Sequence, residues 1–169
     1  MIIFTYIFRL IWFITLILIQ VLICNHICIG GYATPFLYIY FILKLDSSTS
    51  RNSLMFWAFS LGFIIDLFSN TLGMNTIAIV LLAFLRPFLL RLFVSRDNTG
   101  GIGIPSARTM GRVSFNKYIA TSVLLHHSVL LTIEFFSFSD IGGLFLRIFA
   151  GSLLTFIFII AVDSIRKKE

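Results

Sequence analysis

The chain has 169 residues, of which 59% are hydrophobic and 12% are charged, and its mean hydropathy is +1.02. Soluble domains carry about a quarter of charged residues, and a fold of this size could not bury 20 phenylalanines together with so many leucines and isoleucines. The composition therefore excludes an ordinary soluble protein and predicts an all-α membrane protein. The net charge of +6 has to be interpreted by position, because basic residues collect at the cytoplasmic ends of membrane spans.

Six apolar segments are candidates for crossing the hydrocarbon, which takes about 20 residues of helix. We expect spans over residues 7–28, 31–45, 53–69, 75–94, 118–138 and 142–162. The second is the weakest, because it is short and carries Pro35 near its start, and we expect Lys44 to snorkel from its far end. The sequence thus predicts a single polytopic membrane domain over residues 1–169, without a soluble domain.

The first span contains both cysteines, Cys24 and Cys28. Their spacing of four places them on one side of a helix, but a disulfide within one helical turn is geometrically poor. A metal site in this Cys-Asn-His-Ile-Cys stretch stays open as an alternative. The simpler interpretation is that both are buried as small hydrophobic side chains.

Basic residues gather on one side of the predicted spans, and only Arg147 breaks this pattern. The connections after spans 1, 3 and 5 contain no Lys or Arg, and Arg86 lies near the opposite end of span 4. The side opposite those connections collects 11 of the 13 basic residues: Arg9, Lys44, Arg51, Arg91, Arg96, Arg108, Arg112, Lys117, Arg166, Lys167 and Lys168. The positive-inside rule then predicts six transmembrane helices with both termini in the cytoplasm. The basic cytoplasmic loop 96–117 is expected to attract anionic lipid head groups or an acidic partner.

Asp66 interrupts the third span near its predicted outer end, one helical turn after Gly62. Ionisable groups inside spans usually face protein or a water-filled cavity, and a small residue beside them lets another helix approach closely. The residues that follow predict a turn: Ser69, Asn70, Thr71 and Gly73. After this turn, Asn75 or Thr76 is expected to cap the fourth helix by accepting a hydrogen bond from a free backbone N–H. A snorkelling carboxylate without a partner is the alternative for Asp66.

Gly143, Arg147 and Gly151 recur every four residues and form a stripe along one face of the sixth span. This face suits close helix packing, and Arg147 lies at about the same predicted depth as Glu134 and Asp66. A lone buried charge is unfavourable, and a guanidinium group matches the geometry of carboxylates. We therefore expect Arg147 to pair with Asp66, with Glu134 or with both.

His126 and His127 share the fifth span with Glu134. The histidines are adjacent, and Glu134 is two turns away, roughly 10 Å by helical rise, so one helix cannot bring these groups to one metal ion. We expect them to form buried hydrogen bonds between helices. The sequence predicts no catalytic residue, no metal site and no cofactor, although an intramembrane enzyme that combined these histidines with groups from other helices stays open.

The glycine and aspartate of the third span form the motif Gly-x₃-Asp-Leu, which is followed by a short turn with Gly73. With its span number, orientation and length, the chain resembles the MreD family of bacterial rod-shape-determining membrane proteins. The stretches IPSARTMGR (104–112) and HHSVLLTIEFF (126–136) also look like one branch of this family. The resemblance marks Gly62 and Asp66 as motif positions. It implies a fold similar to the substrate-binding subunits of energy-coupling-factor vitamin transporters.

Two functional hypotheses follow from this resemblance. The first is a non-enzymatic scaffold of the cell-elongation complex in the bacterial cytoplasmic membrane. Its implied partners are MreC-like and MreB-like proteins, the RodA/penicillin-binding-protein pair and membrane lipids, and no nucleic acid. The second is a membrane-embedded substrate-binding subunit of a vitamin transporter. A scaffold is expected to lack a formed small-molecule cavity, whereas a transport subunit is expected to enclose an outward-opening pocket lined by polar and aromatic groups.

Overall fold

The computed structural model describes residues 2–94, 103–135 and 140–166. Within these ranges the protein is helical, as predicted, and its backbone forms no β-strand beyond one isolated antiparallel bridge between Ile29 and Ala33. The helices are α1 (Ile2–Leu22), the short 3-10 helix η1 (Cys24–His26), α2 (Ile39–Leu43), α3 (Arg51–Ser69), α4 (Met74–Phe93), α5 (Arg112–Glu134) and α6 (Ile141–Arg166).

Four helical segments are long and apolar enough to cross a membrane. They are Tyr6–His26, Arg51–Ser69, Met74–Phe93 and Ile141–Ile165. Helix α5 has 23 residues but is more polar along its length and does not meet the same criterion. The prediction of a helical membrane protein is confirmed at this level.

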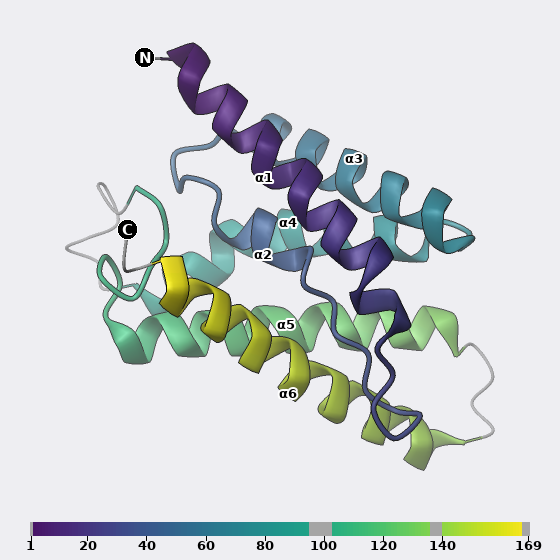
Figure 1. Cartoon of the computed structure of the whole chain (residues 1–169). Helices are drawn as coiled ribbons and strands as arrows, with labels where there is room; N and C mark the ends of the chain where they lie inside the picture. The colour runs from purple at the N-terminus through teal and green to yellow at the C-terminus, as the bar shows by residue number, and fades with distance from the viewer. Residues whose placement is uncertain (1, 95–102, 136–139, 167–169) are drawn as a thin grey trace.

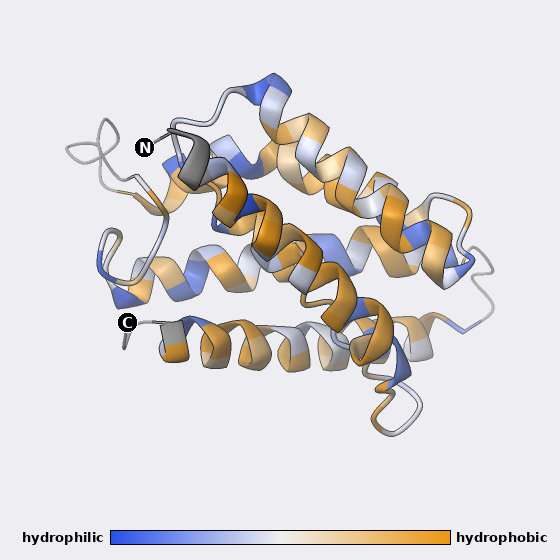
Figure 2. Cartoon of the chain, turned by 45° about the horizontal axis from the view of Figure 1, so that its top comes forward, coloured by the Kyte–Doolittle hydropathy of each residue, from blue (hydrophilic) through white to orange (hydrophobic). Residues whose placement is uncertain are grey.

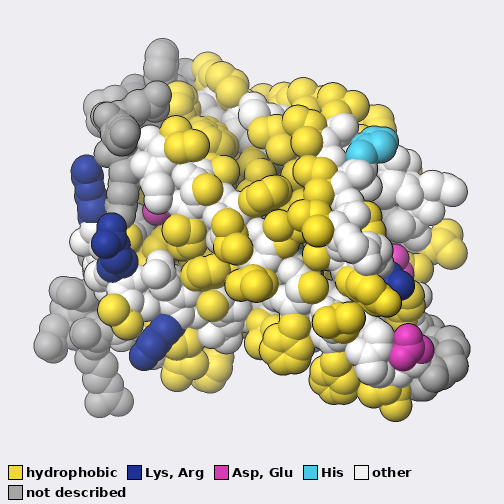
Figure 3. Space-filling model, turned by 60° about the horizontal axis from the view of Figure 1, so that its bottom comes forward, with side chains coloured by type: hydrophobic (Ala, Val, Ile, Leu, Met, Phe, Trp, Pro, Cys, Tyr) yellow, Lys and Arg dark blue, Asp and Glu magenta, His cyan; other side chains and the backbone are white. Residues whose placement is uncertain are grey.

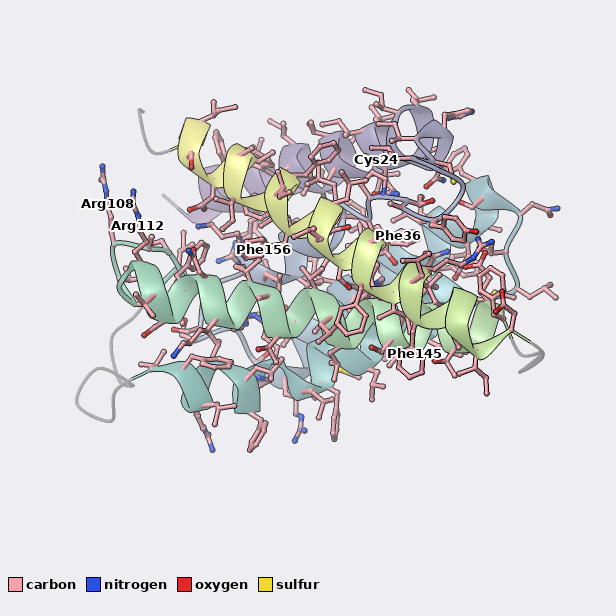
Figure 4. All side chains as sticks on the ribbon, turned by 90° about the horizontal axis from the view of Figure 1, so that it is seen from below. Cys24, Phe36, Arg108, Arg112, Phe145 and Phe156 are labelled. Atoms are coloured by element: carbon pink, nitrogen blue, oxygen red, sulfur yellow. The ribbon has the colours of Figure 1, made fainter. Side chains whose placement is uncertain are left out.

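The long helices form a bundle in which α3, α4, α5 and α6 pack as successive neighbours, while α1 packs against α3 (Figure 1). Helix α1 begins and α6 ends at the same end of the bundle. This end, called the basic end here, also holds residues 44–50 and 103–112, and Figure 4 shows Arg108 and Arg112 pointing away from the helices there. The opposite end, called the far end, holds residues 24–34 and 69–74.

The outside of the bundle is apolar along the helices (Figure 2). On α3, for example, the side chains of Phe56, Phe59 and Phe63 are exposed, and Phe59 and Phe63 stack with ring centroids 5.8 Å apart. Figure 3 shows hydrophobic side chains covering the middle of one face, with Lys and Arg mainly towards one side. Hydrocarbon is a suitable solvent for such a surface, and water is not.

The segment 31–45 does not form the helix that the sequence predicted. Only Ile39–Leu43 is helical, and the chain before it makes a turn with positive φ at Gly30 and Gly31 and then runs without regular structure past Pro35. Proline has no N–H to donate to a helix, and the two glycines adopt a conformation that other residues disfavour. The segment nevertheless lies in the centre of the bundle, with Ile39 fully buried.

Side chains from the surrounding helices satisfy the backbone of this buried segment. Gln20 of α1, itself fully buried, accepts a hydrogen bond from the Leu37 N–H at 2.8 Å and donates to the Pro35 carbonyl at 3.1 Å. The Phe36 N–H donates to the Thr155 hydroxyl of α6 at 3.0 Å. Protein groups thus replace water as the partners of this buried irregular backbone, which is a condition for such backbone inside a membrane.

Candidate functional site

At Gly62, α3 and α4 approach each other closely. A Cβ atom at this position would lie 2.5 Å from the Thr76 Cα and 2.8 Å from the Ile79 Cγ2. The first of these neighbours is backbone and cannot rotate away. The expectation that Gly62 permits close helix packing is therefore confirmed.

Asp66 is buried, and its carboxylate receives hydrogen bonds from the α3–α4 turn and from the start of α4. Oδ1 accepts from the Thr71 hydroxyl at 2.5 Å, the Asn75 N–H at 3.1 Å and the Asn75 amide at 3.0 Å. Oδ2 accepts from the N–H and the hydroxyl of Thr76 at 2.9 and 2.6 Å. The predicted capping role of Asn75 or Thr76 is thus wrong in direction, because both residues donate and the acceptor is Asp66.

This arrangement places a negative charge where the first N–H groups of α4 have no partner within the helix, which is the favourable position for an anion. The backbone of the turn is shaped to match. Asn70 ends α3 with φ of 53°, Gly73 precedes α4 with φ of 81°, and the Asp66 carbonyl accepts from the Thr71 N–H at 3.0 Å. The turn predicted around Gly73 is confirmed. Asp66 accepts hydrogen bonds from Thr71, near the beginning of the turn, and from Asn75 and Thr76, which follow it.

A chain of buried hydrogen bonds leads from Asp66 into the centre of the bundle. The side-chain nitrogen of Asn75 donates to Asp66. The side-chain oxygen of Asn75 therefore points the other way and accepts from the Tyr38 hydroxyl at 3.0 Å. The Tyr38 oxygen in turn lies 2.8 Å from His126 Nε2, which the hydrogen-bond pattern assigns as the donor. His126 Nδ1 is buried and has no hydrogen-bond partner among the described residues.

His127 connects α5 to α6 and to the irregular segment. Its Nδ1 lies 2.9 Å from the Val123 carbonyl, and its Nε2 lies 3.2 Å from the Thr155 hydroxyl, which also accepts from the Phe36 N–H. Gly151 allows this contact, because a Cβ there would lie 3.0 Å from His127 Cδ2. The expected buried hydrogen bond between helices is confirmed for His127, whereas His126 bonds to Tyr38, which lies just before α2.

Arg147 does not form the ion pair that the sequence predicted. In the described part of the chain it makes no salt bridge with Asp66, whose oxygens are occupied by α4, and none with Glu134. Its guanidinium carbon instead lies 4.6 Å from the ring centroid of Phe135 and 5.3 Å from that of Tyr32. These are cation–π distances, which give an arginine a favourable environment without a carboxylate.

The stripe that contains Arg147 is also used differently from the prediction. A Cβ at Gly143 would first meet the side chain of Asp140, which caps α6 by accepting the Gly143 N–H at 2.9 Å. At Gly151, by contrast, the atoms nearest to an added Cβ belong to His127 of α5, at 3.0 and 3.3 Å.

The far end contains a pocket of about 490 Å³, called the far-end pocket here, which opens between α1, the residues after it, the α3–α4 turn, α5 and α6. A volume of this size is typical of small-molecule sites. Polar and charged residues contribute to its lining: Asn25, Thr71, Asn75, His127, Glu134 and Arg147. A formed pocket is what the transport-subunit hypothesis expects, whereas the scaffold hypothesis expects none, so this observation favours the transport subunit.

At the basic end, Lys44 and Asp163 form a buried ion pair that the sequence analysis missed. Their Nζ and Oδ1 atoms are 2.6 Å apart, and the side chains are 9% and 8% exposed. Tyr40 donates to the same carboxylate at 3.1 Å, and Lys44 also donates to the Pro105 carbonyl at 2.9 Å. The prediction that Lys44 snorkels is therefore wrong. In the sequence, Lys44 and Asp163 lie at the same predicted end of their spans, and this shared position could have indicated the pair.

Arg86 of α4 is buried and binds the carbonyl end of the short helix α2. Its Nε donates to the Tyr118 hydroxyl at 3.2 Å, and its guanidinium group donates to the carbonyl oxygens of Leu43 and Leu45. These carbonyls lack partners within a helix as short as α2, and a cation at a helix C-terminus is favourable. Arg86 therefore stabilises the place where the buried segment ends.

Both cysteines are free thiols; Cys24 is buried, as predicted, whereas Cys28 is exposed, so the prediction of a buried Cys28 is wrong. Within the described residues, no three side chains of the His, Cys, Asp or Glu type lie close enough to hold a metal ion. The polar groups gathered here bind backbone, cap helices and line the far-end pocket.

Comparisons of the chain with protein-family models, with curated proteins and with solved structures found no match.

Proposed function

We propose that this chain is a non-enzymatic membrane component of the bacterial cell-elongation machinery, similar to MreD. One observation carries the proposal: both oxygens of the Asp66 carboxylate are occupied by donors from the chain itself. A carboxylate engaged in this way has no free oxygen for acid–base chemistry or for a substrate. The Gly62–Asp66 motif is thus used to build the fold, as suits a protein that acts by its shape and contacts.

In this proposal the chain crosses the cytoplasmic membrane six times, with both termini inside. Four crossings are the long apolar helices α1, α3, α4 and α6. The fifth is α5, whose polar residues Ser122, His126 and His127 are fully buried in the bundle. The remaining crossing is the buried segment that ends with α2. Its weak apolar and helical signal fits a span that the other helices enclose and lipid does not touch.

The partners in this proposal are those that the resemblance implies, namely MreC-like and MreB-like proteins and the RodA/penicillin-binding-protein pair. The basic end would face the cytoplasm, where Arg108 and Arg112 project from the helices. The far end would face the periplasm. The similarity of the fold to the vitamin-binding subunits of energy-coupling-factor transporters belongs to the same proposal.

The proposal is tested by depleting the protein in the rod-shaped bacterium that encodes it. Cells are expected to become round without acquiring a requirement for any vitamin. Re-expression of the wild-type chain should restore rods, and the Asp66→Asn variant should restore them poorly, because the α3–α4 junction is weakened. The matched control is Asp140→Asn, since asparagine caps a helix N-terminus nearly as well as aspartate where one acceptor suffices. Depleted cells that stay rod-shaped would contradict the proposal.

The far-end pocket favours a second candidate, a membrane-embedded substrate-binding subunit of a vitamin or micronutrient transporter. The pocket is lined by polar and aromatic groups from several helices, as such a subunit requires. The same depletion experiment separates the two candidates. A transport subunit predicts growth that depends on an added vitamin mixture while the cells remain rods.

A further inference from the structure

The far-end pocket is lined by one carboxylate and one guanidinium group, which do not form a salt bridge with each other. Arg147 lines it from α6 and Glu134 lines it from the end of α5. Neither side chain forms a hydrogen bond or an ion pair with the described residues, and the two do not pair with each other within 4.0 Å. Two opposite charges that share a pocket without meeting leave room for a ligand between them.

Arg147 offers an anion site of a particular kind. Its guanidinium group lies near the rings of Tyr32 and Phe135, at 5.3 and 4.6 Å, and these rings restrict where the side chain can point. Its N–H donors have no acceptor among the described residues. Arginine in this state matches a phosphate or a carboxylate group, which can accept two parallel hydrogen bonds.

The carboxylate of Glu134 indicates which second group the ligand carries. An anion with no positive group would bind Arg147 but would be repelled by the nearby Glu134 carboxylate, and a simple cation would be repelled by Arg147. A ligand that carries both an anionic group and an ammonium group satisfies both side chains at once. The pocket therefore selects for a zwitterion.

The edge of the pocket is apolar. Leu22 at the end of α1 and Phe68 near the end of α3 both line it, and they are 66% and 68% exposed on the outside of the bundle. A soluble zwitterion would leave these side chains without a partner, whereas the chains of a lipid would cover them. A pocket that combines charged side chains of both signs with exposed apolar side chains fits an amphiphile.

We propose that the far-end pocket binds the head group of a zwitterionic phospholipid, with its phosphate on Arg147, its ammonium group on Glu134 and its chains along Leu22 and Phe68. Phosphatidylethanolamine has this chemistry. This inference goes beyond the proposed function and does not depend on it, because a membrane scaffold and a transport subunit could each hold such a lipid.

Native mass spectrometry of the full-length protein in non-ionic detergent tests the inference. Phosphatidylethanolamine should be retained as one bound lipid, and phosphatidylglycerol, which lacks the ammonium group, should bind roughly 10- to 100-fold more weakly. The soluble head group sn-glycero-3-phosphoethanolamine should bind more weakly than the lipid by at least about tenfold, because it leaves Leu22 and Phe68 uncovered.

Three variants assign the contacts. Arg147→Gln should weaken both lipids, and Glu134→Gln should weaken phosphatidylethanolamine to the level of phosphatidylglycerol. Arg112→Gln removes an exposed arginine at the basic end and should change neither. If Arg147→Gln does not fold, Arg147→Lys keeps the positive charge without the planar fork and should still weaken both lipids.

Equal binding of the two lipids by the wild-type protein would overturn the inference. So would an unchanged lipid preference in Glu134→Gln, or a soluble head group that binds as tightly as the lipid. None of these results would alter the cell-shape outcome of depletion, so a failure here is separate from a failure of the proposed function.

Discussion

Single residues at the far end perform tasks that depend on their detailed chemistry. Gly62 has no Cβ, and this allows the backbones of α3 and α4 to meet. One turn later, Asp66 accepts the hydrogen bonds that the beginning of α4 would otherwise leave unsatisfied. The motif is therefore a joint between two helices, in which one residue provides space and the other provides acceptors.

Gly62→Ala should destabilise the protein by about 1–3 kcal/mol, the usual cost of overpacking, because its Cβ would clash with the Thr76 backbone. Thermal unfolding in detergent measures this. The control is Gly142→Ala, another helical glycine, where a Cβ would have no neighbour closer than 3.8 Å. That control should be neutral or slightly stabilising, because alanine favours helix more than glycine does. Equal melting temperatures for the two variants would contradict this role of Gly62.

Asp66→Asn should cost about 1–3 kcal/mol, because one oxygen becomes an NH₂ group that faces donors and leaves them unsatisfied. The expected result is faster amide hydrogen exchange at Asn75 and Thr76 and a lower melting temperature. Asp140→Asn should leave both measurements close to wild type, since Asp140 is exposed and accepts from Gly143 through one oxygen. Unchanged exchange at Thr76 in Asp66→Asn would show that the carboxylate is not needed there.

At the scale of elements, the irregular segment before α2 is stabilised by side chains from other helices. Gln20→Leu keeps the size of the side chain but removes the acceptor of the Leu37 N–H and the donor to the Pro35 carbonyl. We expect a loss of about 1–3 kcal/mol and faster hydrogen exchange at Leu37. Thr15→Val, on an exposed position of α1, is the control and should have little effect. Protection at Leu37 that survives Gln20→Leu would contradict the assignment.

The ion pair at the basic end joins the residue after α2 to the end of α6. Lys44→Met should destabilise the protein by about 3–5 kcal/mol, because Asp163 would remain buried without its cation. The double variant Lys44→Met/Asp163→Leu should recover part of this loss, since no unpaired charge is left. The melting temperatures of the single and the double variant test this expectation. A double variant less stable than Lys44→Met would mean that the pair contributes more than charge neutralisation.

The sequence predicted those elements whose apolar pattern is continuous. Helices α3, α4 and α6 lie close to the predicted ranges, because lipid-facing and packed residues are apolar all along them. The segment 31–45 was misjudged, because its structure depends on Gln20, Thr155 and Arg86, which are far away in sequence and give no local signal. Arg147 was misjudged for a related reason, since an aromatic environment replaced the carboxylate that charge alone suggested.

For the molecule as a whole, the account depends on the number of membrane crossings. The four long apolar helices alone do not place Cys28 and Ser48 on opposite sides of a membrane unless the segment between them also crosses. That segment contains the irregular stretch, α2 and the backbone contacts from Gln20 and Arg86. The placement of the far-end pocket and the basic end on opposite sides of a membrane, and with it the proposed role in cell elongation, depends on this crossing.

Cysteine labelling in intact inner membranes tests the crossing most directly. Cys28 is exposed and native, and in the proposed orientation a membrane-impermeant maleimide should label it from the periplasmic side in a Cys24→Ala background. In a chain without either native cysteine, Ser48→Cys should be labelled only after the membrane is broken, because its loop would lie in the cytoplasm. Labelling of both positions from the same side would contradict the account, because the segment between them would then not cross the membrane.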